Sequence, residues 1–90
     1  MAVMVISGLQ RFMELSRIIE SRGISNIRFY NSTLRRVLAE PILPVVRFMD
    51  ILILGKDARF LPHLREVLNE ARRCRVPVIS EENLWQLQTA

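Results

Sequence analysis

The segment Met49-Asp-Ile-Leu-Ile-Leu-Gly-Lys56 contains four consecutive aliphatic residues, 51–54, followed by a glycine. A continuous apolar run of this kind is typical of a strand that is buried on both faces of a sheet. An amphipathic segment follows it and leads to a short second strand at Val76-Pro-Val-Ile-Ser80. A strand, a helix and a strand in this order form a parallel unit with a right-handed crossover. The sequence therefore predicts an α/β fold.

Two further segments complete the predicted sheet. The run Ala2-Val-Met-Val-Ile6 is also continuously apolar, so we expect it in the centre of the sheet. Residues 27–30 alternate apolar and polar side chains, and Pro77 interrupts the last strand, so both of these strands are expected at edges. We predict a single domain over residues 1–90, with a four-stranded parallel sheet of order 2-1-3-4 and helices on both faces.

Two long helices are expected between the strands. Apolar residues recur at helical spacing over residues 10–22, and Gly23 ends this helix in a left-handed cap. The second helix is expected to begin at Pro62, whose missing N–H costs nothing in a first turn, and to continue through Arg73. Cys74 is the single cysteine, which excludes an internal disulfide, and we expect it to pack in the core.

A short last helix is predicted after the fourth strand. Ser80 is expected to cap it, and the acidic residues 81–82 complement the helix dipole in its first turn. Leu84 and Leu87 alone offer little area for docking this helix. We therefore expect Trp85 to be at least half buried, so that Trp85→Ala would cost about 3 to 5 kcal/mol.

Residues 32–49 give the least clear pattern. Ser32 or Thr33 is expected to cap a short helix that ends at Pro41. Its inward-facing residues would be Leu34, Val37 and Leu38. The apolar segment 41–48 is too interrupted by proline for a central strand, and it either covers the sheet or meets another molecule. We favour the covering role.

The composition limits the classes of partner that this protein is expected to bind. The formal charge of +4 and the pI near 10.6 suit anionic partners, although most arginines alternate with glutamates as on an ordinary solvated surface. No apolar run approaches the roughly 18 residues of a membrane span, and the run at residues 2–6 is too short for a signal peptide. We expect an intracellular protein, cytoplasmic or nuclear, without a membrane partner.

The predicted strand order reverses between the first and third strands, and ligands of open parallel sheets bind at such a point. The residues expected there are Ser7, Gly8, Gly55, Lys56 and Arg59. A hydroxyl, a glycine that permits close approach, the free N–H groups at a helix start and an ammonium group suit a phosphate. The alternative is that both glycines only turn the chain.

The segments Asp50-Ile-Leu-Ile-Leu-Gly-Lys-Asp-Ala58 and Val76-Pro-Val-Ile-Ser-Glu-Glu-Asn-Leu-Trp85 resemble the C-terminal half of BRCT domains. The resemblance is clearest to BRCT domains of bacterial NAD-dependent DNA ligases and of replication factor C large subunits. Val5-Ile-Ser-Gly8 is similar to the end of the first strand in this family. The resemblance implies a phosphate-binding module in DNA repair or replication.

The resemblance also implies a phosphate pocket. Ser7 and Gly8 match its first two positions, whereas Phe12 stands at the usual arginine position and the second-helix lysine is absent. The basic residues available as substitutes are Arg11, Lys56, Arg59 and Arg65. We expect a phosphate to bind Ser7, the backbone at Gly8 and Leu9, and Lys56 or Arg11.

No recognisable catalytic motif is present. His63 is the only histidine, and Asp50 and Asp57 flank the third predicted strand at opposite ends, so they are not expected to work as an acid and a base. We predict a non-catalytic binding module without metal or cofactor, whose partner is a DNA 5′ end, a phosphoprotein or another protein. The alternative is an assembly protein that forms homo-oligomers through the apolar segment 41–48.

Overall fold

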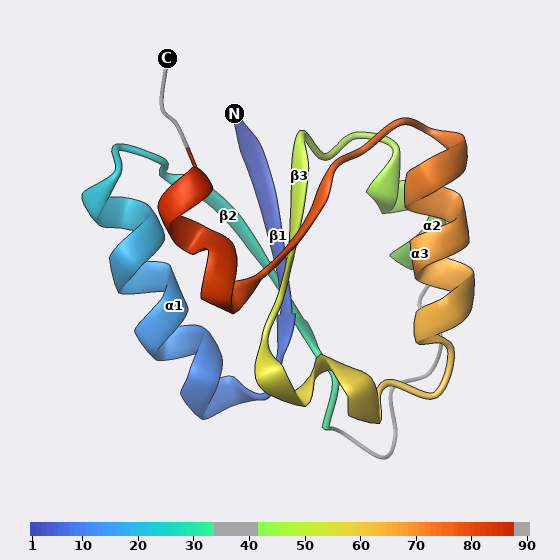
Figure 1. Ribbon diagram of the computed structural model, residues 1–90, viewed down its shortest axis with the longest axis horizontal. Coiled ribbons are helices and arrows are strands. Elements are labelled where there is room, and N and C mark those ends of the chain that lie inside the picture. The colour runs from blue at the N-terminus through green and yellow to red at the C-terminus, as the bar shows by residue number, and fades with distance from the viewer. Residues whose placement is uncertain (34–41, 88–90) are drawn as a thin grey trace.

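The computed structural model describes residues 1–33 and 42–87, in which strands and helices alternate along the chain (Figure 1). The strands are β1 (Ala2–Ser7), β2 (Asn26–Asn31), β3 (Ile51–Leu54) and β4 (Val78–Ser80). The α-helices are α1 (Leu9–Ser21), α2 (Ile42–Val46) and α3 (Leu64–Arg73), and the 3₁₀ helices are η1 (Lys56–Phe60) and η2 (Glu81–Gln86). The helix expected before Pro41 lies outside the described residues.

The four strands form one parallel sheet of order β2-β1-β3-β4, which confirms the predicted topology. In the register of the sheet, Val3 of β1 lies opposite Ile27 of β2 on one side and Ile51 of β3 on the other. Ile53 of β3 lies opposite Ile79 of β4. The two continuously apolar runs occupy the centre, because only they present apolar side chains to both faces.

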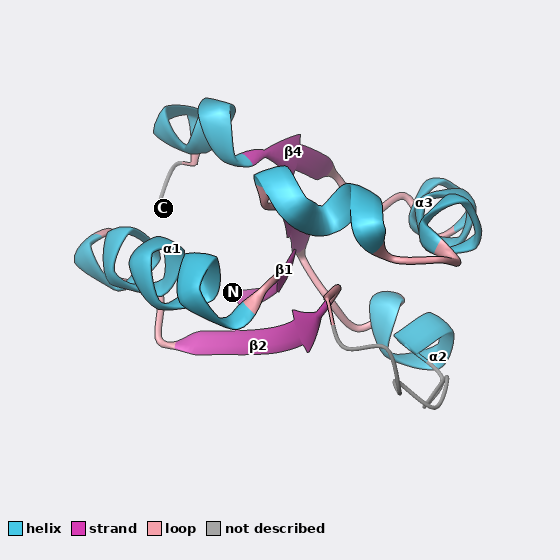
Figure 2. Ribbon diagram, turned by 90° about the horizontal axis from the view of Figure 1, so that it is seen from below, coloured by secondary structure: helices cyan, strands magenta, loops and turns pink. Residues whose placement is uncertain are grey.

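Helices cover both faces of the sheet, so the core has two layers. Figure 2 shows α1 and η2 on one side and α2 and α3 on the other. The sheet residues facing α1 and η2 are Val3, Val5 and Ile53, which pack with Leu15, Ile19, Leu84 and Leu87. The sheet residues facing α2 and α3 are Met4, Ile6 and Leu52, which pack with Ile42, Val46, Val67 and Ala71. Successive strand residues thus alternate between the two layers.

The helix ends follow the prediction at α1 and depart from it at α3. Gly23, at φ +85°, ends α1 in the left-handed conformation that glycine adopts without strain. The second helix begins at Leu64, and Pro62 lies in the turn before it. The chain between β3 and this turn forms η1, and Leu61 is extended after it, as the residue before a proline prefers to be.

The described part of the apolar segment 41–48 covers the sheet, which is the role we favoured. Residues 42–46 form α2, which the sequence did not predict, and Ile42 and Val46 are buried against α3. Pro44 is tolerated because it lies in the first turn of this short helix, where its N–H has no partner to lose. Phe48 is exposed after the helix ends.

The prediction for Trp85 is wrong, because its side chain is 68% exposed. The expectation assumed an α-helix, but residues 81–86 form a 3₁₀ helix with about three residues per turn. Residues three apart therefore share a face, and the buried face consists of Glu81, Leu84 and Leu87. These two leucines dock η2 without the tryptophan.

We expect Leu87→Ala to lower the free energy of unfolding by about 2 to 4 kcal/mol, because the side chain is only 2% exposed in the core. Trp85→Ala should cost less than about 1 kcal/mol, since it removes an exposed side chain. Urea denaturation followed by circular dichroism measures both variants without relying on tryptophan fluorescence. A larger loss from Trp85→Ala than from Leu87→Ala would contradict this placement of η2.

Candidate functional site

The carboxyl ends of β1 and β3 meet where the strand order reverses. β1 ends at Ser7 and is followed by Gly8, which precedes α1, whereas β3 ends at Leu54 and is followed by Gly55, which precedes η1. The Gly55 N–H donates to the carbonyl of Ile6 at 2.9 Å, which joins the two strand ends. A ligand of an open parallel sheet would be expected at this edge.

Asp57 extends from η1 into this edge. Its Oδ2 atom accepts a hydrogen bond from the Gly8 N–H at 2.8 Å. A Cβ atom at Gly8 would lie only 2.5 Å from the same oxygen, and a Cβ atom at Gly55 would lie 2.7 Å from the Cβ atom of Ser7. Both glycines therefore allow the backbone to approach the chain's own side chains closely.

Ser7 is fully buried, and its hydroxyl donates to the carbonyl of Gly8 at 2.9 Å. The carbonyl of Ser7 accepts the N–H of Ser32, whose own hydroxyl donates to the carbonyl of Asp57 at 2.9 Å. These bonds connect the end of β1 to Ser32, which follows β2, and connect Ser32 to Asp57 in η1. The serine expected to bind a phosphate is part of this internal network.

Glu81 is the second carboxylate at this edge. Its residue is 7% exposed, and its two oxygens accept hydrogen bonds from Nε and Nη2 of Arg11, both at 2.8 Å. The backbone N–H of Lys56 donates to the same carboxylate at 3.2 Å, and the Lys56 ammonium lies 3.9 Å away. A planar guanidinium that binds both oxygens in this way makes a strong, oriented ion pair.

These donors keep Glu81 ionised. Burial alone would raise the pKa of the Glu81 carboxyl, but the hydrogen bonds from Arg11 and Lys56 and their positive charges outweigh burial and lower the pKa. The same contact, above all the hydrogen bond to Glu81, raises the pKa of Arg11. The ion pair is therefore present across the physiological pH range.

The remaining predicted site residues lie apart from these two carboxylates. The side chain of Leu9 is exposed at the start of α1, and Arg59 lies over the ring of its neighbour Phe60, 5.0 Å from the ring centroid. Phe12 stacks on the ring of Phe29 in β2, with centroids 4.2 Å apart. Arg65 is exposed on α3. The structure thus brings together only part of the predicted site.

The carboxyl-edge cluster, which we define as Gly8, Arg11, Lys56, Asp57 and Glu81, already contains its own anions. Asp57 accepts the backbone N–H that a phosphate would use, and Glu81 binds the Arg11 guanidinium and lies 3.9 Å from the exposed Lys56 ammonium. A phosphate placed here would lie beside two carboxylates and would be repelled by like charge. Its binding would require both carboxylates to move away.

Titratable groups elsewhere take part in structural contacts. Asp50 accepts the backbone N–H of Ala2 at 2.6 Å, at the opposite end of β3 from Asp57. The Nε2 atom of His63 lies 3.4 Å from the hydroxyl of Tyr30, just before α3. Among residues 1–33 and 42–87, no group of three or more His, Cys, Asp or Glu side chains is arranged to hold a metal ion.

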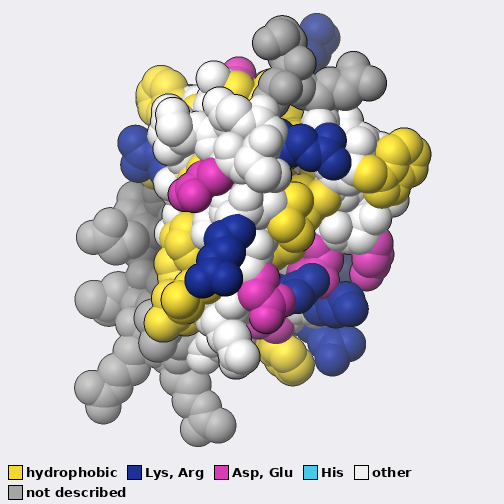
Figure 3. Space-filling model, turned by 90° about the vertical axis from the view of Figure 1, so that its left-hand side faces the viewer, with side chains coloured by type: hydrophobic (Ala, Val, Ile, Leu, Met, Phe, Trp, Pro, Cys, Tyr) yellow, Lys and Arg dark blue, Asp and Glu magenta, His cyan; other side chains and the backbone are white. Residues whose placement is uncertain are grey.

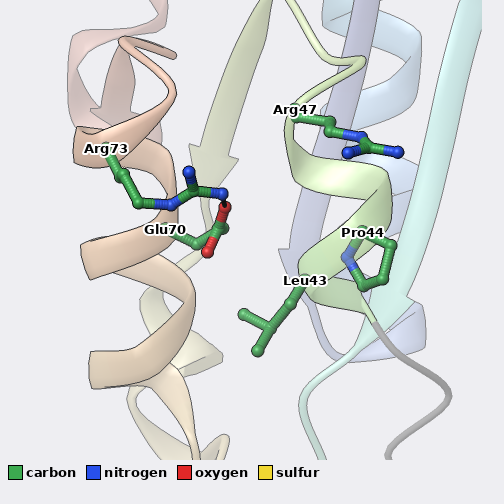
Figure 4. Close-up of a pocket in the computed structure, with 5 residues that line it drawn as sticks. All are labelled: Leu43, Pro44, Arg47, Glu70 and Arg73. Atoms are coloured by element: carbon green, nitrogen blue, oxygen red, sulfur yellow. Dashed lines mark hydrogen bonds and ion pairs between the residues drawn. The ribbon is translucent and has the colours of Figure 1, made fainter.

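A concave region lies between α2 and α3, apart from the carboxyl edge. The α2–α3 groove has a volume of about 350 Å³ and is lined by Leu43, Pro44, Arg47, Glu70 and Arg73 (Figure 4). Figure 4 shows Glu70 and Arg73 extending from α3 toward α2, and Leu43 extending toward α3, whereas the side chains of Pro44 and Arg47 are directed away from α3. The sequence did not indicate this groove, because α2 itself was not predicted.

Glu70 is the acidic side chain that lines the groove. Glu70 forms an ion pair with Arg73 and accepts a hydrogen bond from the Cys74 thiol at 3.2 Å. The hydrogen bond from Arg73, followed by that from Cys74, lowers the pKa of Glu70, and the positive charge of Arg47 lowers it further. Two guanidinium groups thus act on one ionised carboxylate.

The surface on the α1 side carries mixed charges. Figure 3 faces this side and shows basic and acidic side chains next to one another, with hydrophobic side chains between them. Such a surface has no large area of one sign to attract a polyanion.

In the described part of the chain, none of the helices has both the length and the apolar character needed to cross a membrane.

Comparison of the chain with protein-family models, with curated proteins and with solved structures gives no match. Function is therefore inferred from the residues and geometry of this chain.

We expect Glu81→Gln to lower the free energy of unfolding at neutral pH by about 1 to 2 kcal/mol, because Arg11 loses charge-assisted hydrogen bonds. Since folding lowers the pKa of Glu81, its contribution is complete above the ordinary value of 4.5 and is lost as the pH falls through the lowered value. The difference between the wild type and the variant should therefore shrink below about pH 4.5.

Urea denaturation over a pH series measures this difference. The matched control is Glu82→Gln, which removes the same charge from an exposed neighbour that makes no hydrogen bond or ion pair within the described residues. It should change stability by less than about 0.5 kcal/mol. An effect of Glu81→Gln that is constant down to acidic pH would show that the ionised carboxylate does not stabilise the fold.

Proposed function

We propose that this chain is a non-catalytic binding module of the BRCT type that binds a protein partner, in the DNA repair or replication setting that the resemblance implies. The four-stranded parallel sheet of order 2-1-3-4 supports the class, because it is the fold that the resemblance over residues 50–58 and 76–85 implies. A fold alone does not define an activity, so the choice of partner depends on the site.

The observation that carries the proposal is the occupation of the carboxyl-edge cluster by Asp57 and Glu81. Recognition of a DNA 5′ phosphate or a phosphopeptide needs free donors, and here the chain's own carboxylates accept the Gly8 N–H, the Lys56 N–H and the Arg11 guanidinium. Both carboxylates accept hydrogen bonds that stabilise the fold. We therefore assign neither of them the role of a catalytic acid or base.

Self-association through the apolar segment 41–48 is less well supported. Its residues Ile42 and Val46 are buried inside the molecule. Among residues 42–48, the exposed large hydrophobic side chain is that of Phe48, whose ring lies under the guanidinium of Arg47 at 4.8 Å. One ring offers much less than the several hundred Å² of apolar surface that an assembly interface uses.

The proposal predicts that binding does not depend on phosphate. Fluorescence anisotropy with a blunt DNA duplex, with and without a 5′ phosphate, should give affinities within about twofold of each other. The same should hold for a serine peptide with and without phosphorylation. A partner captured from cell extract should remain bound after treatment with phosphatase and nuclease.

Lys56→Ala and Arg72→Ala form the matched pair for this test, since each removes one exposed positive charge, the first at the cluster and the second on α3. Both should lower any residual DNA binding equally, through nonspecific attraction. Phosphate-dependent binding that Lys56→Ala abolishes and Arg72→Ala preserves would overturn the proposal and assign phosphate recognition to the carboxyl edge.

A further inference from the structure

We propose that the open edge of β4 binds an extended acidic segment of the protein partner as an added strand. One apolar side chain of that segment fills the pocket beside β4, and a carboxylate two residues away binds Arg72. This inference rests on the proposed function, because it names the surface and the chemistry of the same protein partner.

The outer side of β4 pairs with no other strand of the described residues. The Leu52 N–H donates to the carbonyl of Pro77 at 2.9 Å, so the backbone groups of Pro77 face β3. Because these groups alternate sides along a strand, those of Val78 point to the open side. The missing N–H of Pro77 is thus on the β3 side and does not block the outer edge. An extended peptide can add to such an edge through backbone hydrogen bonds.

A pocket of about 390 Å³ lies beside this edge, and its walls come from α3, from β3 and from the start of β4. The residues that line it are Leu54, Leu68, Arg72, Val76 and Val78. Val78 lies opposite Leu52 in the register, so its side chain is on the same face of the sheet as α3, and it is 36% exposed. The volume is at the lower end of the range for ligand pockets, which suits a single apolar side chain of a peptide.

Arg72 is the charged residue that lines this pocket. Its side chain is exposed, and it makes no hydrogen bond or ion pair within residues 1–33 and 42–87. The groove between α2 and α3 differs, because there Glu70 already binds the guanidinium of Arg73. All five N–H donors of Arg72 therefore remain for a ligand, and a guanidinium can bind a carboxylate through two parallel hydrogen bonds.

The two flanks of α3 differ in charge. At about 100° per residue, Arg65 and Arg72 lie within about 60° of Leu68, on the flank that borders the pocket. Glu66 and Glu70 lie on the other flank, and Figure 4 shows Glu70 extending toward α2. A carboxylate on the β4 side of α3 therefore meets positive charge from this helix, which favours an acidic partner.

The spacing along α3 matches that of an extended chain. Leu68 and Arg72 are four residues apart, which corresponds to about 6 Å along a helix axis. Side chains two residues apart in a strand point to the same face and are separated by about 6.6 Å. Since α3 connects two parallel strands, it runs back along the sheet and is roughly aligned with an added strand. An apolar residue packed against Leu68 thus places the side chain two positions away beside Arg72.

A second copy of this chain fits the edge less well. Antiparallel pairing of two β4 strands about a twofold axis perpendicular to the sheet would place the two α3 helices side by side on one face. Arg65 and Arg72 of both copies would then lie close together, and repulsion between like charges opposes this contact. A nucleic acid lacks the regular N–H and C=O groups with which an edge strand pairs.

The experiment uses the full chain and a fluorescein-labelled peptide in which every second residue is threonine and the residues between alternate glutamate and valine. Fluorescence anisotropy measures the Kd. We expect this peptide to bind, and Arg72→Gln to raise its Kd about three- to tenfold. A peptide with glutamine in place of glutamate should bind more weakly to the wild type and lose nothing further from Arg72→Gln, because the ion pair is then already absent.

Backbone methylation of the peptide tests strand addition. Only alternate N–H groups of an added strand point to β4, so N-methylation of one alternating set of residues should raise the Kd about tenfold or more. Methylation of the other set should change it by less than about twofold. Val78→Pro removes an outward N–H of β4 and keeps an apolar side chain, so it should raise the Kd about three- to tenfold.

Arg73→Gln is the matched control, since it removes the same charge from the neighbouring residue, whose guanidinium binds Glu70. It should change the Kd by less than about twofold at physiological salt. Amide chemical shifts recorded during the titration should change around residues 65–72 and 76–80. Circular dichroism checks that each variant is folded.

Absence of peptide binding, equal losses from Arg72→Gln and Arg73→Gln, or equal effects of the two methylation patterns would overturn the edge site. A dimer in size-exclusion chromatography that Val78→Pro dissociates would assign the edge to a second copy instead. A captured partner that binds independently of phosphate but ignores Arg72→Gln and Val78→Pro would refute the edge site while leaving the proposed function intact. Binding that depends on phosphate and on Lys56 would refute the proposed function itself.

Discussion

The carboxylate of Glu81 connects three segments that are distant in the sequence. It begins η2, accepts two hydrogen bonds from Arg11 on α1, and accepts the backbone N–H of Lys56 at the start of η1. A buried carboxylate is unfavourable unless such donors surround it, so this contact either forms completely or destabilises the fold. The ion pair thus adds an oriented polar contact to the packing of Leu15 and Ile19, which also holds α1 against η2 and the sheet.

The carboxyl edge of an open parallel sheet usually offers unpaired N–H groups to a ligand. In this chain Asp57 and Glu81 supply the acceptor oxygens that a phosphate would otherwise supply. An internal acceptor loses no translational freedom when it binds, whereas a separate ligand does, so the internal group competes effectively for the same donors. The usual binding edge has thus become part of what stabilises the fold.

The sheet order was predictable because two apolar runs suit central strands and Pro77 restricts the last strand to an edge. The left-handed end of α1 followed from Gly23 in the same way. The exposure of Trp85 was not predictable, because it depends on a helix period of three instead of 3.6. From the sequence, the negative charge of Glu81 was attributed to the helix dipole. Its actual partner, Arg11, is 70 residues away in the sequence, and local sequence patterns do not reveal contacts over that separation.

The carboxyl edge and the surface of α2 and α3 contribute differently to stability. The carboxyl-edge cluster joins strand ends and helix starts, so a change in Asp57 or Glu81 disturbs the packing of the sheet. Arg73 is exposed on α3 and Arg47 is exposed directly after α2, whereas the buried sides of these two helices hold them against the core. Substitution of these exposed arginines should therefore cost little stability, because surface changes away from the core shift it by only about 0.5 kcal/mol.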